Sequence, residues 1–278
     1  MLDRIDDLPI WLINLPRAVE RRESMVSQLN ALGLNYTLFE GVDGVARETE
    51  MLASMNTPAF ARNMGRNILL GGIGCYHSHL GVWREFLETG AGVALVLEDD
   101  VVFHDDFLVA LNLGLRAQAH WDILKLNCVR AKLPISQGHI GHYRLNAYWG
   151  PKTGTAAYLI KRETAAKILP AMLPITRATD HEISRFFVHD YRLRGIEPFP
   201  SHVDDHNQSQ ITGVGFADVV KFPLRQRLPH YRLKAGNYLR RLMWLVKRGE
   251  VFPRKRQLVS AAPSGLDKAK LPKQSKTI

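Results

Sequence analysis

The chain has few cysteines and no long apolar run, and both absences exclude classes of protein. Its two cysteines, Cys75 and Cys128, stand far apart and outside any CxxC pair, so the sequence supports neither a disulfide framework nor a zinc finger. Nothing approaches the roughly 18 consecutive apolar residues of a membrane-spanning helix. Residues 1–16 also lack the basic flank of a signal peptide, and we therefore expect a cytoplasmic protein.

The composition beyond these absences is that of a folded soluble protein. The chain has 278 residues, of which 46% are hydrophobic and 23% are charged. A chain of this length buries roughly 70–75% of the surface that its unfolded form exposes. One large α/β domain with an appendage is therefore the simplest organisation, and its folding requires no metal or disulfide.

The net charge of +10 is concentrated near the carboxyl terminus. Residues 221–256 hold twelve lysines and arginines against one acid, Glu250, whereas residues 1–220 carry a net negative charge. This asymmetry divides the chain into a body of residues 1–220, a basic segment of residues 221–256 and a tail of residues 257–278. We expect the tail to be disordered, since it mixes Pro, Ser, Gly and Lys without apolar periodicity.

Residues 231–248 of the basic segment fit an amphipathic helix, with Trp244 on its basic side and Arg232 at the edge. Such a helix either lies on an anionic membrane surface or packs its apolar face on the domain while its charges stay in solvent. Binding to nucleic acid is the least favoured alternative, because the acidic body would repel phosphates. The apolar face comprises Tyr231, Ala235, Tyr238, Leu239, Leu242, Leu245 and Val246, and the basic face comprises Lys234, Arg240, Arg241, Lys247 and Arg248.

The body begins with a strand, a helix and a second strand. Residues 9–14 have the form of a buried strand, residues 17–32 have helical spacing and stop at Gly33, and residues 35–39 form the next strand. Because βαβ units imply parallel strands with right-handed crossovers, the predicted fold is an open, mostly parallel α/β sheet flanked by helices. Further strands are predicted at residues 93–97, 121–127 and 155–160, with helices at residues 75–88 and 162–169.

Three acids, Glu98, Asp99 and Asp100, directly follow the wholly apolar run at residues 93–97. Ligands of open α/β sheets bind at the carboxyl ends of the strands, where these carboxylates fall. A divalent cation such as Mg²⁺ or Mn²⁺ would offset their mutual repulsion, since hard cations prefer oxygen ligands. The alternative is an acidic turn in solvent. Strand alternation predicts that Glu98 and Asp100 share the ligand pocket while Asp99 points to the other side.

Four segments in this order resemble glycosyltransferase family 25: INLPR with ERR at residues 13–22, FEGVDG at 39–44, GGIGCYHSHL at 71–80 with Trp83, and LVLEDD at 95–100. The run GTAAYLIKR at residues 154–162 and the pair Asp180–His181 also match the family's pattern. The resemblance covers about residues 8–215. The family includes bacterial lipooligosaccharide galactosyl- and glucosyltransferases and domains of collagen galactosyltransferases.

The resemblance implies a catalytic domain of the GT-A type, similar to a Rossmann fold. It also implies metal-assisted, inverting transfer of a hexose from a UDP-sugar to a glycan. Asp100 would hold Mn²⁺ or Mg²⁺, and Glu98 and Asp99 would complete the acidic motif. The family usually has Glu before Ile-Gly in the third segment, but here Gly72 occupies that place. Contacts with the donor nucleotide are implied for Asn14, Arg17, Arg21, Asp43, Gly44, Ser78 and His79, although hydrogen bonding within the fold is the favoured role of Ser78 and His79.

Two further roles follow from the resemblance. An inverting displacement needs a base for the acceptor hydroxyl, and Asp180 is the candidate, with capping of its helix as the alternative. Many GT-A enzymes supply a late histidine to the metal or diphosphate, which suggests His202 as a metal ligand. His206 lies in the same polar segment, and a solvated histidine is the alternative for both.

The leading hypothesis is therefore a lipopolysaccharide or lipooligosaccharide glycosyltransferase that is cytoplasmic and peripheral on the inner membrane through its basic segment. Its expected partners are UDP-galactose or UDP-glucose, a lipid-linked oligosaccharide acceptor and an anionic membrane surface, and no nucleic acid. One alternative is a metal-dependent nucleotidyltransferase or phosphoesterase that uses the same acids. Another is a non-catalytic module that binds membrane or nucleic acid. The sequence leaves the oligomeric state open.

Overall fold

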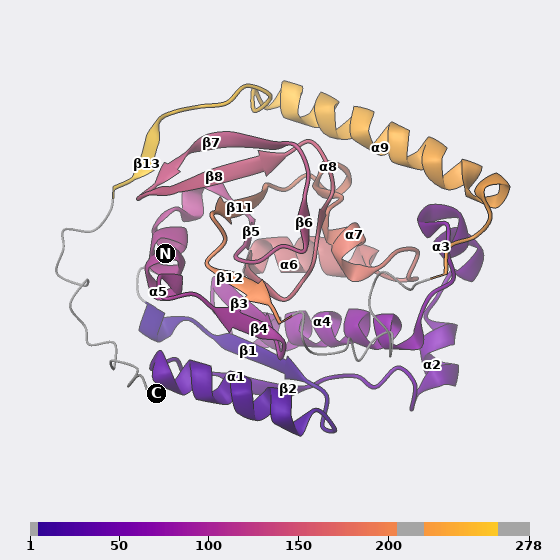
Figure 1. Cartoon of the computed structure of the whole chain (residues 1–278), viewed down its shortest axis with the longest axis horizontal. Helices are drawn as coiled ribbons and strands as arrows, with labels where there is room; N and C mark the ends of the chain where they lie inside the picture. Colours follow the sequence, from indigo (N-terminus) through magenta and orange to yellow (C-terminus); the bar gives the residue numbers. More distant parts are fainter. Residues whose placement is uncertain (1–4, 205–219, 261–278) are drawn as a thin grey trace, which may run out of the picture.

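The computed structural model of the protein describes residues 5–204 and 220–260 (Figure 1). Its central sheet has the strand order β13-β7-β8-β11-β5-β10-β3-β1-β2, with seven strands in one direction and β8 and β10 reversed. The predicted α/β class and mostly parallel sheet are confirmed. The strands are β1 Ile10–Asn14, β2 Thr37–Glu40, β3 Val93–Glu98, β5 Ile123–Lys125, β7 Pro134–Ile140, β8 Tyr143–Tyr148, β10 Ala157–Lys161, β11 Leu193–Glu197 and β13 Gln257–Val259.

Helices cover both faces of this sheet, and two short strand pairs form separate small sheets (Figure 1). The helices are α1 Val19–Ala31, α2 Glu48–Ala53, α3 Thr57–Met64, α4 Leu70–Glu88, α5 Phe107–Arg116, α6 Arg162–Ile168, α7 Thr179–Ile183, α8 Phe186–His189 and α9 Leu228–Lys247. The short strands are β4 Val101–Phe103 with β12 Ser201–Val203, and β6 Arg130–Ala131 with β9 Lys152–Thr153. Single turns of 3-10 helix are η1 Ile5–Asp7, η2 Gln118–His120, η3 Leu169–Ala171 and η5 Leu224–Arg227.

The first strand shows why the apolar runs are apolar at every position. Alternate side chains of β1 enter different cores: Ile10 and Leu12 pack with α1 and α5, whereas Trp11 and Ile13 pack with α4 and α6. A strand covered on both faces cannot alternate apolar with polar residues. The same reason explains the uninterrupted run of β3.

Strand β10 runs antiparallel between β3 and β5, and this direction matters for the site. The apolar pattern of residues 155–160 predicts a strand but not its direction. The reversal pairs Ala157 with Leu97, so the residues that enter β10 meet the carboxyl end of β3. Thr155 is thereby placed beside Glu98.

The basic segment folds onto the body through a different helix face from the one expected. Trp244 donates from Nε1 to Asp190 Oδ1 at 2.9 Å and packs edge-on against Phe186, and Arg241 is buried beneath it. Most of the predicted apolar face points away from the body, although Leu245 is fully buried. The helix thus packs on the domain, as one alternative expected, but through Trp244, Arg241 and Leu245 rather than through the whole predicted apolar face.

The predicted disordered tail begins too early. Gln257–Val259 form β13, which pairs in parallel with β7 at the edge of the central sheet. A strand of only three residues, with the sequence QLV, gives no pattern above that of a loop, which is why the sequence did not indicate a strand. Residues 261–278 lie outside the described residues.

Candidate functional site

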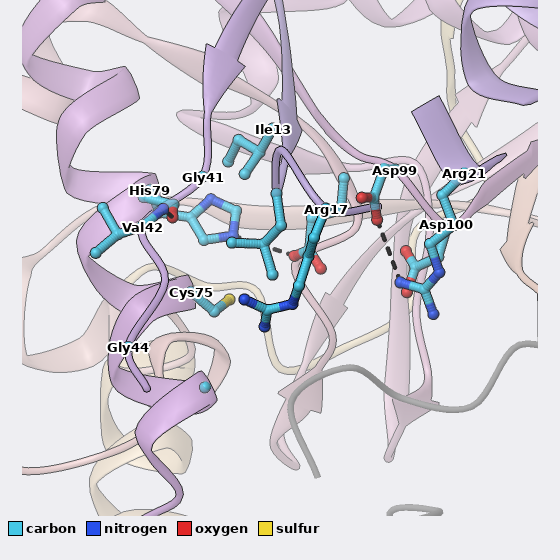
Figure 2. Close-up of a pocket in the computed structure, with 14 residues that line it drawn as sticks. Ile13, Arg17, Arg21, Gly41, Val42, Gly44, Cys75, His79, Asp99 and Asp100 are labelled. Atoms are coloured by element: carbon cyan, nitrogen blue, oxygen red, sulfur yellow. Dashed lines mark hydrogen bonds and ion pairs between the residues drawn. The ribbon is translucent and has the colours of Figure 1, made fainter. Parts of the chain in front are cut away.

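A cavity of about 110 Å³ opens where β1 and β3 end, between the chain after β2 and the first turns of α4 (Figure 2). Eight of the residues predicted for the site line it, and Figure 2 shows the acidic and basic side chains converging from separate elements. The eight are Arg17, Arg21, Gly44, Ser78, His79, Glu98, Asp99 and Asp100. Sequence segments almost 90 residues apart thus form one cavity, because parallel strands end at the same edge of the sheet.

All three acids of the LEDD motif face this cavity, so the prediction that Asp99 points away is wrong. Strand β3 ends at Glu98, and the next two residues form a turn in which strand alternation no longer applies. Asp99 accepts from Asn14 Nδ2 at 2.7 Å and from Arg21 Nη1 at 3.3 Å. Burial outweighs these contacts and raises the pKa of Asp99.

Glu98 is held in a fixed orientation by neutral and basic donors. Its Oε1 lies 3.1 Å from His79 Nε2 and accepts from Thr155 Oγ1 at 2.5 Å. The other ring nitrogen of His79 lies 3.0 Å from the Tyr158 hydroxyl, to which Trp83 also donates. Burial opposes ionisation, but the hydrogen bonds from His79 and Thr155 lower the pKa of Glu98, so it is a carboxylate at neutral pH.

Asp100 differs from its neighbours because its buried Oδ1 has no hydrogen-bond partner among the described residues. Burial and the adjacent charges of Glu98 and Asp99 raise its pKa to about 7. A buried, unpartnered carboxylate oxygen in an acidic cluster is the donor that a hard divalent cation fits. Asp100 is therefore the residue of this site most in need of a positive partner.

A second possible set of metal ligands is formed by Cys75, His79 and Glu98, whose ligand atoms lie within 4.8 Å of one another. Burial raises the pKa of the Cys75 thiol well above its usual range, which keeps it protonated, and metals bind the thiolate. His79 and Glu98 are also already bonded to each other. The donor chemistry therefore favours Asp100 over this set.

The basic side of the cavity comes from the chain that follows β1. Arg17 forms an ion pair with Asp43, and Asp43 Oδ1 also accepts from the backbone of Val45 at 3.0 Å. Asn14 is buried and donates to the Ala18 carbonyl, which fixes this turn at the cavity edge. Asp43 thus holds Arg17 and Asn14 holds Asp99, although neither Asp43 nor Asn14 lines this cavity itself.

The glycine-rich start of α4 lets the helix approach the chain after β2. A Cβ on Gly44 would lie 1.9 Å from the Leu70 carbonyl, and one on Gly74 would lie 2.3 Å from the Val42 carbonyl. Ser78 accepts from the Val42 amide and donates to the Gly74 carbonyl, each at 2.8 Å. These contacts agree with the predicted structural role of Ser78. Because glycines conceal helical periodicity, the sequence missed the first five residues of the helix.

Asp180 lies beside the cavity rather than in its lining. Its Oδ2 accepts from the Gly154 amide at 3.1 Å, and its Oδ1 accepts from the His181 amide. Ala178 is the N-cap of α7, so Asp180 is not the capping residue. Its charge acts on Cys75, which does line the cavity. Asp180 is therefore positioned next to the acidic cluster on the side of Gly154.

The histidine predicted to bind metal is not brought to the cavity. His202 lies on β12 opposite Val102, and its Nδ1 is 2.9 Å from Nε2 of the exposed His104. The ring is not among the residues that line the cavity. His206 lies outside the described residues.

Sequence reasoning missed four residues around the acids, namely Cys75, Lys125, Thr155 and Tyr158. Lys125 is fully buried, donates to the Gly154 carbonyl at 2.5 Å, and has its pKa lowered by burial to about 8. Cys75, Thr155 and Tyr158 fall within the segments that resemble the family, so their position was the available signal. No such signal marks Lys125, which reads as one polar residue in a strand.

Lys152 is a second buried lysine, and it gives a prediction on stability. Burial lowers its pKa to about 7, so between about pH 7 and 10 the unfolded chain binds more protons than the folded one, and stability rises with pH. The rise due to this group is up to about 1.4 kcal/mol per pH unit. We expect Lys152→Met to remove that rise, measured as the difference between urea unfolding free energies at about pH 7 and about pH 9. The same difference in both proteins would contradict the prediction.

The comparison with protein families agrees with this geometry. The model of "Glycosyltransferase family 25 (LPS biosynthesis protein)" matches residues 7–183, which is more than half of the chain. The chain belongs to glycosyltransferase family 25. The matched range includes β1, β3, the acidic motif and Asp180.

Curated proteins of animals are among the relatives. Procollagen galactosyltransferase 1-B of Xenopus laevis is 29% identical over 230 residues, which cover 72% of this chain and 37% of that protein. Procollagen galactosyltransferase 2 of Homo sapiens is 29% identical, and the match covers 60% of this chain and 29% of that protein. A glycosyltransferase 25 family member of Anopheles gambiae is 30% identical, and the match again covers 60% of this chain and 29% of that protein. The chain thus spans about a third of the length of these relatives.

Proposed function

We propose that this glycosyltransferase moves galactose from UDP-galactose to a hydroxyl of a glycan, with a divalent cation and with inversion at the transferred carbon. The observation that carries the proposal is the cavity in which the unpartnered oxygen of Asp100 faces Arg17 and Arg21. Acids for a cation and arginines for phosphate or base are the groups that a nucleoside diphosphate sugar requires. The choice of galactose over glucose follows the names of the relatives.

The proposed transfer requires the cavity to stabilise the negative charge of the departing diphosphate. Asp100 would hold a divalent cation, which would supply positive charge for the departing UDP. Arg21, beside Asp99, and Arg17, at the edge of the same cavity, add donors for phosphate or uracil. Glu98 is oriented by His79 and Thr155, and its negative charge makes this part of the cavity attractive to a cation.

Asp180 is proposed as the base. It would take the proton of the acceptor hydroxyl, whose oxygen then forms the new bond while the bond to UDP breaks on the opposite face of the sugar. The amide of Gly154 and the backbone of α7 fix its orientation. Its place beside the acidic cluster, outside the donor cavity, suits a residue that serves the acceptor.

The experiment is to incubate the protein with UDP-galactose and Mn²⁺ without acceptor and to follow products by NMR. Slow hydrolysis to UDP and galactose is expected, with β-galactose appearing first because UDP-galactose has an α linkage. UMP or galactose 1-phosphate would instead indicate a phosphoesterase or nucleotidyltransferase. Absence of any product or of UDP binding with Mn²⁺ and with Mg²⁺ would refute the proposal.

For the acceptor, we propose a lipid-linked glycan at an anionic membrane surface, reached by docking of α9. No helix in the described part of the chain combines the length and apolar character needed to cross a bilayer. The outer face of α9, however, carries large apolar side chains that are more than half exposed: Leu228, Leu239, Met243 and Val246. Arg225, Arg232, Arg240 and Lys247 are exposed around this face. Apolar side chains bordered by cations suit a bilayer of anionic lipids.

We expect the double variant Leu239→Ser and Val246→Ser to bind vesicles of phosphatidylglycerol and phosphatidylcholine at least about tenfold more weakly, since it removes apolar area from the docking face. Sedimentation measures the bound fraction. Leu52→Ser with Val109→Ser is the matched control, because these side chains are exposed on other surfaces. Unchanged binding of the first variant, or equal binding to vesicles of phosphatidylcholine alone, would contradict the assignment.

A further inference from the structure

A second cavity, of about 170 Å³, lies between α9 and the body, on the face of the helix opposite its exposed apolar side chains. Residues of α3, β6, β9, α7 and α9 contribute to its lining. Two of them are histidines, His181 and His230, and none is acidic. Six are lysines or arginines: Arg130, Lys132, Arg177, Arg185, Lys234 and Arg241.

The positive charge of this cavity is only partly neutralised by the protein. Arg177 and Arg185 share a single carboxylate, that of Glu182, at 3.3 and 2.6 Å. Arg130 and Lys132 form no ion pair with any residue that the structure describes, and the same holds for Lys234. The cavity therefore gathers positive charge that the described acids do not neutralise, and such a cavity favours binding of an anion.

Arg241 provides an independent sign of a missing anion. The residue is 5% exposed, yet no carboxylate pairs with it within the described residues. Its Nη2 reaches only the Ser184 carbonyl, at 3.4 Å, and the Nε atoms of Arg241 and Arg185 are buried without an acceptor. Burial lowers the pKa of Arg241 to about 10, as expected of a guanidinium that lacks a counter-ion. An anion in the cavity would supply the missing acceptors.

The position of the cavity relates it to Asp180. Thr153 and His181 line it, and their chain neighbours, Gly154 and Asp180, are joined by a hydrogen bond from the Gly154 amide to Asp180 Oδ2. On the other side of Gly154, Thr155 donates a hydrogen bond to Glu98, which lines the first cavity, the one at the ends of β1 and β3 (the acidic cavity). Asp180 thus stands between the two cavities.

We propose that this second, cationic cavity binds the acceptor through phosphate or carboxylate groups on its sugars. It would thereby present an acceptor hydroxyl to Asp180. This inference rests on the proposed function, since it requires a donor in the acidic cavity. The volume of about 170 Å³ suits a single substituted monosaccharide unit. A glycan anchored in a membrane beneath α9 would need to pass one helix diameter, about 10 Å, to enter the cavity. The anionic class of acceptor is therefore consistent with docking through the opposite face of α9.

The test is calorimetric titration of the full chain with glucose 1,6-bisphosphate, with digalacturonate and with uncharged maltose. Excess UDP and Mn²⁺ are present to fill the acidic cavity, and salt is kept at about 50 mM to limit screening. The variant is Lys132→Gln with Lys234→Gln, two exposed side chains whose loss does not disturb the core. The matched control is Arg116→Gln with Lys255→Gln, which removes the same charge at two exposed side chains outside this cavity and outside the docking face of α9. UDP-galactose hydrolysis by each protein is measured in parallel.

We expect at least one of the two anions to bind while maltose does not, and the cavity variant to bind that anion at least about tenfold more weakly. Whichever anion binds identifies the charged group as phosphate or carboxylate. The control variant should retain the affinity, and all proteins should hydrolyse UDP-galactose equally. Equal affinity in the cavity variant, an equal loss in the control, or no binding of either anion would overturn the inference. Anion binding at the cavity without any binding of UDP-galactose would overturn the proposed function and the acceptor role with it.

Discussion

Replacing Asp100 by Asn is expected to reduce the release of UDP from UDP-galactose by at least about 100-fold. The substitution keeps the shape of the side chain but removes the charge that would hold a cation at the end of β3. Its buried Oδ1 has no other partner among the described residues, so this atom serves no hydrogen bond within the protein that the change could break. The measurement is the steady-state rate of UDP release with saturating Mn²⁺.

Loss of folding would not account for that result. The pKa of Asp100 is raised to about 7 by burial and by Glu98 and Asp99, so its charge is unfavourable without a cation. The Asn variant should therefore melt at the same temperature as the parent protein or higher. Asp105→Asn, an exposed acid beyond β4, removes the same charge and should keep full activity. Full activity of Asp100→Asn would contradict the assignment of this residue.

Replacing Asp180 by Asn is expected to lower kcat for galactose transfer or hydrolysis by about 100- to 10,000-fold, the usual contribution of a general base. The affinity for UDP-galactose should change little, because Asp180 lies outside the donor cavity. The amide oxygen of Asn can accept from only one of the two amides that Asp180 serves, those of Gly154 and His181, so a small loss of thermal stability is expected as well. Rate measurements and calorimetry with UDP-galactose separate the two effects.

A structural role for Asp180 predicts a different pattern. If Asp180 only fixed the start of α7, the Asn variant would lose thermal stability and donor affinity together with activity. If it served neither purpose, kcat would stay within a few fold of the parent value. Only a large loss of kcat with unchanged donor affinity supports Asp180 as the base.

The sequence predicted the strands that carry the site because these strands are covered on both faces. Uninterrupted apolar runs at β1 and β3 located their carboxyl ends, and the acids after Leu97 marked one edge of the cavity. The resemblance then joined the segments that contribute Arg17 and Ser78, which no local pattern relates to the acids. Eight of the predicted residues meet at one cavity for this reason.

What the sequence could not predict depends on contacts between distant segments. The direction of β10 is set by its neighbours, and it brings Thr155 to Glu98. The orientation of α9 follows from the match of Trp244 to Asp190 and Phe186, which outweighs the burial of Leu239 and Val246. His202 was predicted because many GT-A enzymes supply a late histidine to the metal or diphosphate. In this chain the ring of His202 instead lies beside His104.

The central claim is that Asp100 would hold a divalent cation that binds together with the diphosphate of the donor. Titration of Mn²⁺ followed by electron paramagnetic resonance, with and without UDP, tests it directly. The account predicts weak Mn²⁺ binding alone, much tighter binding when UDP is present, and loss of that tightening in Asp100→Asn. Mn²⁺ binding that UDP leaves unchanged, or that Asp100→Asn retains in full, would contradict it.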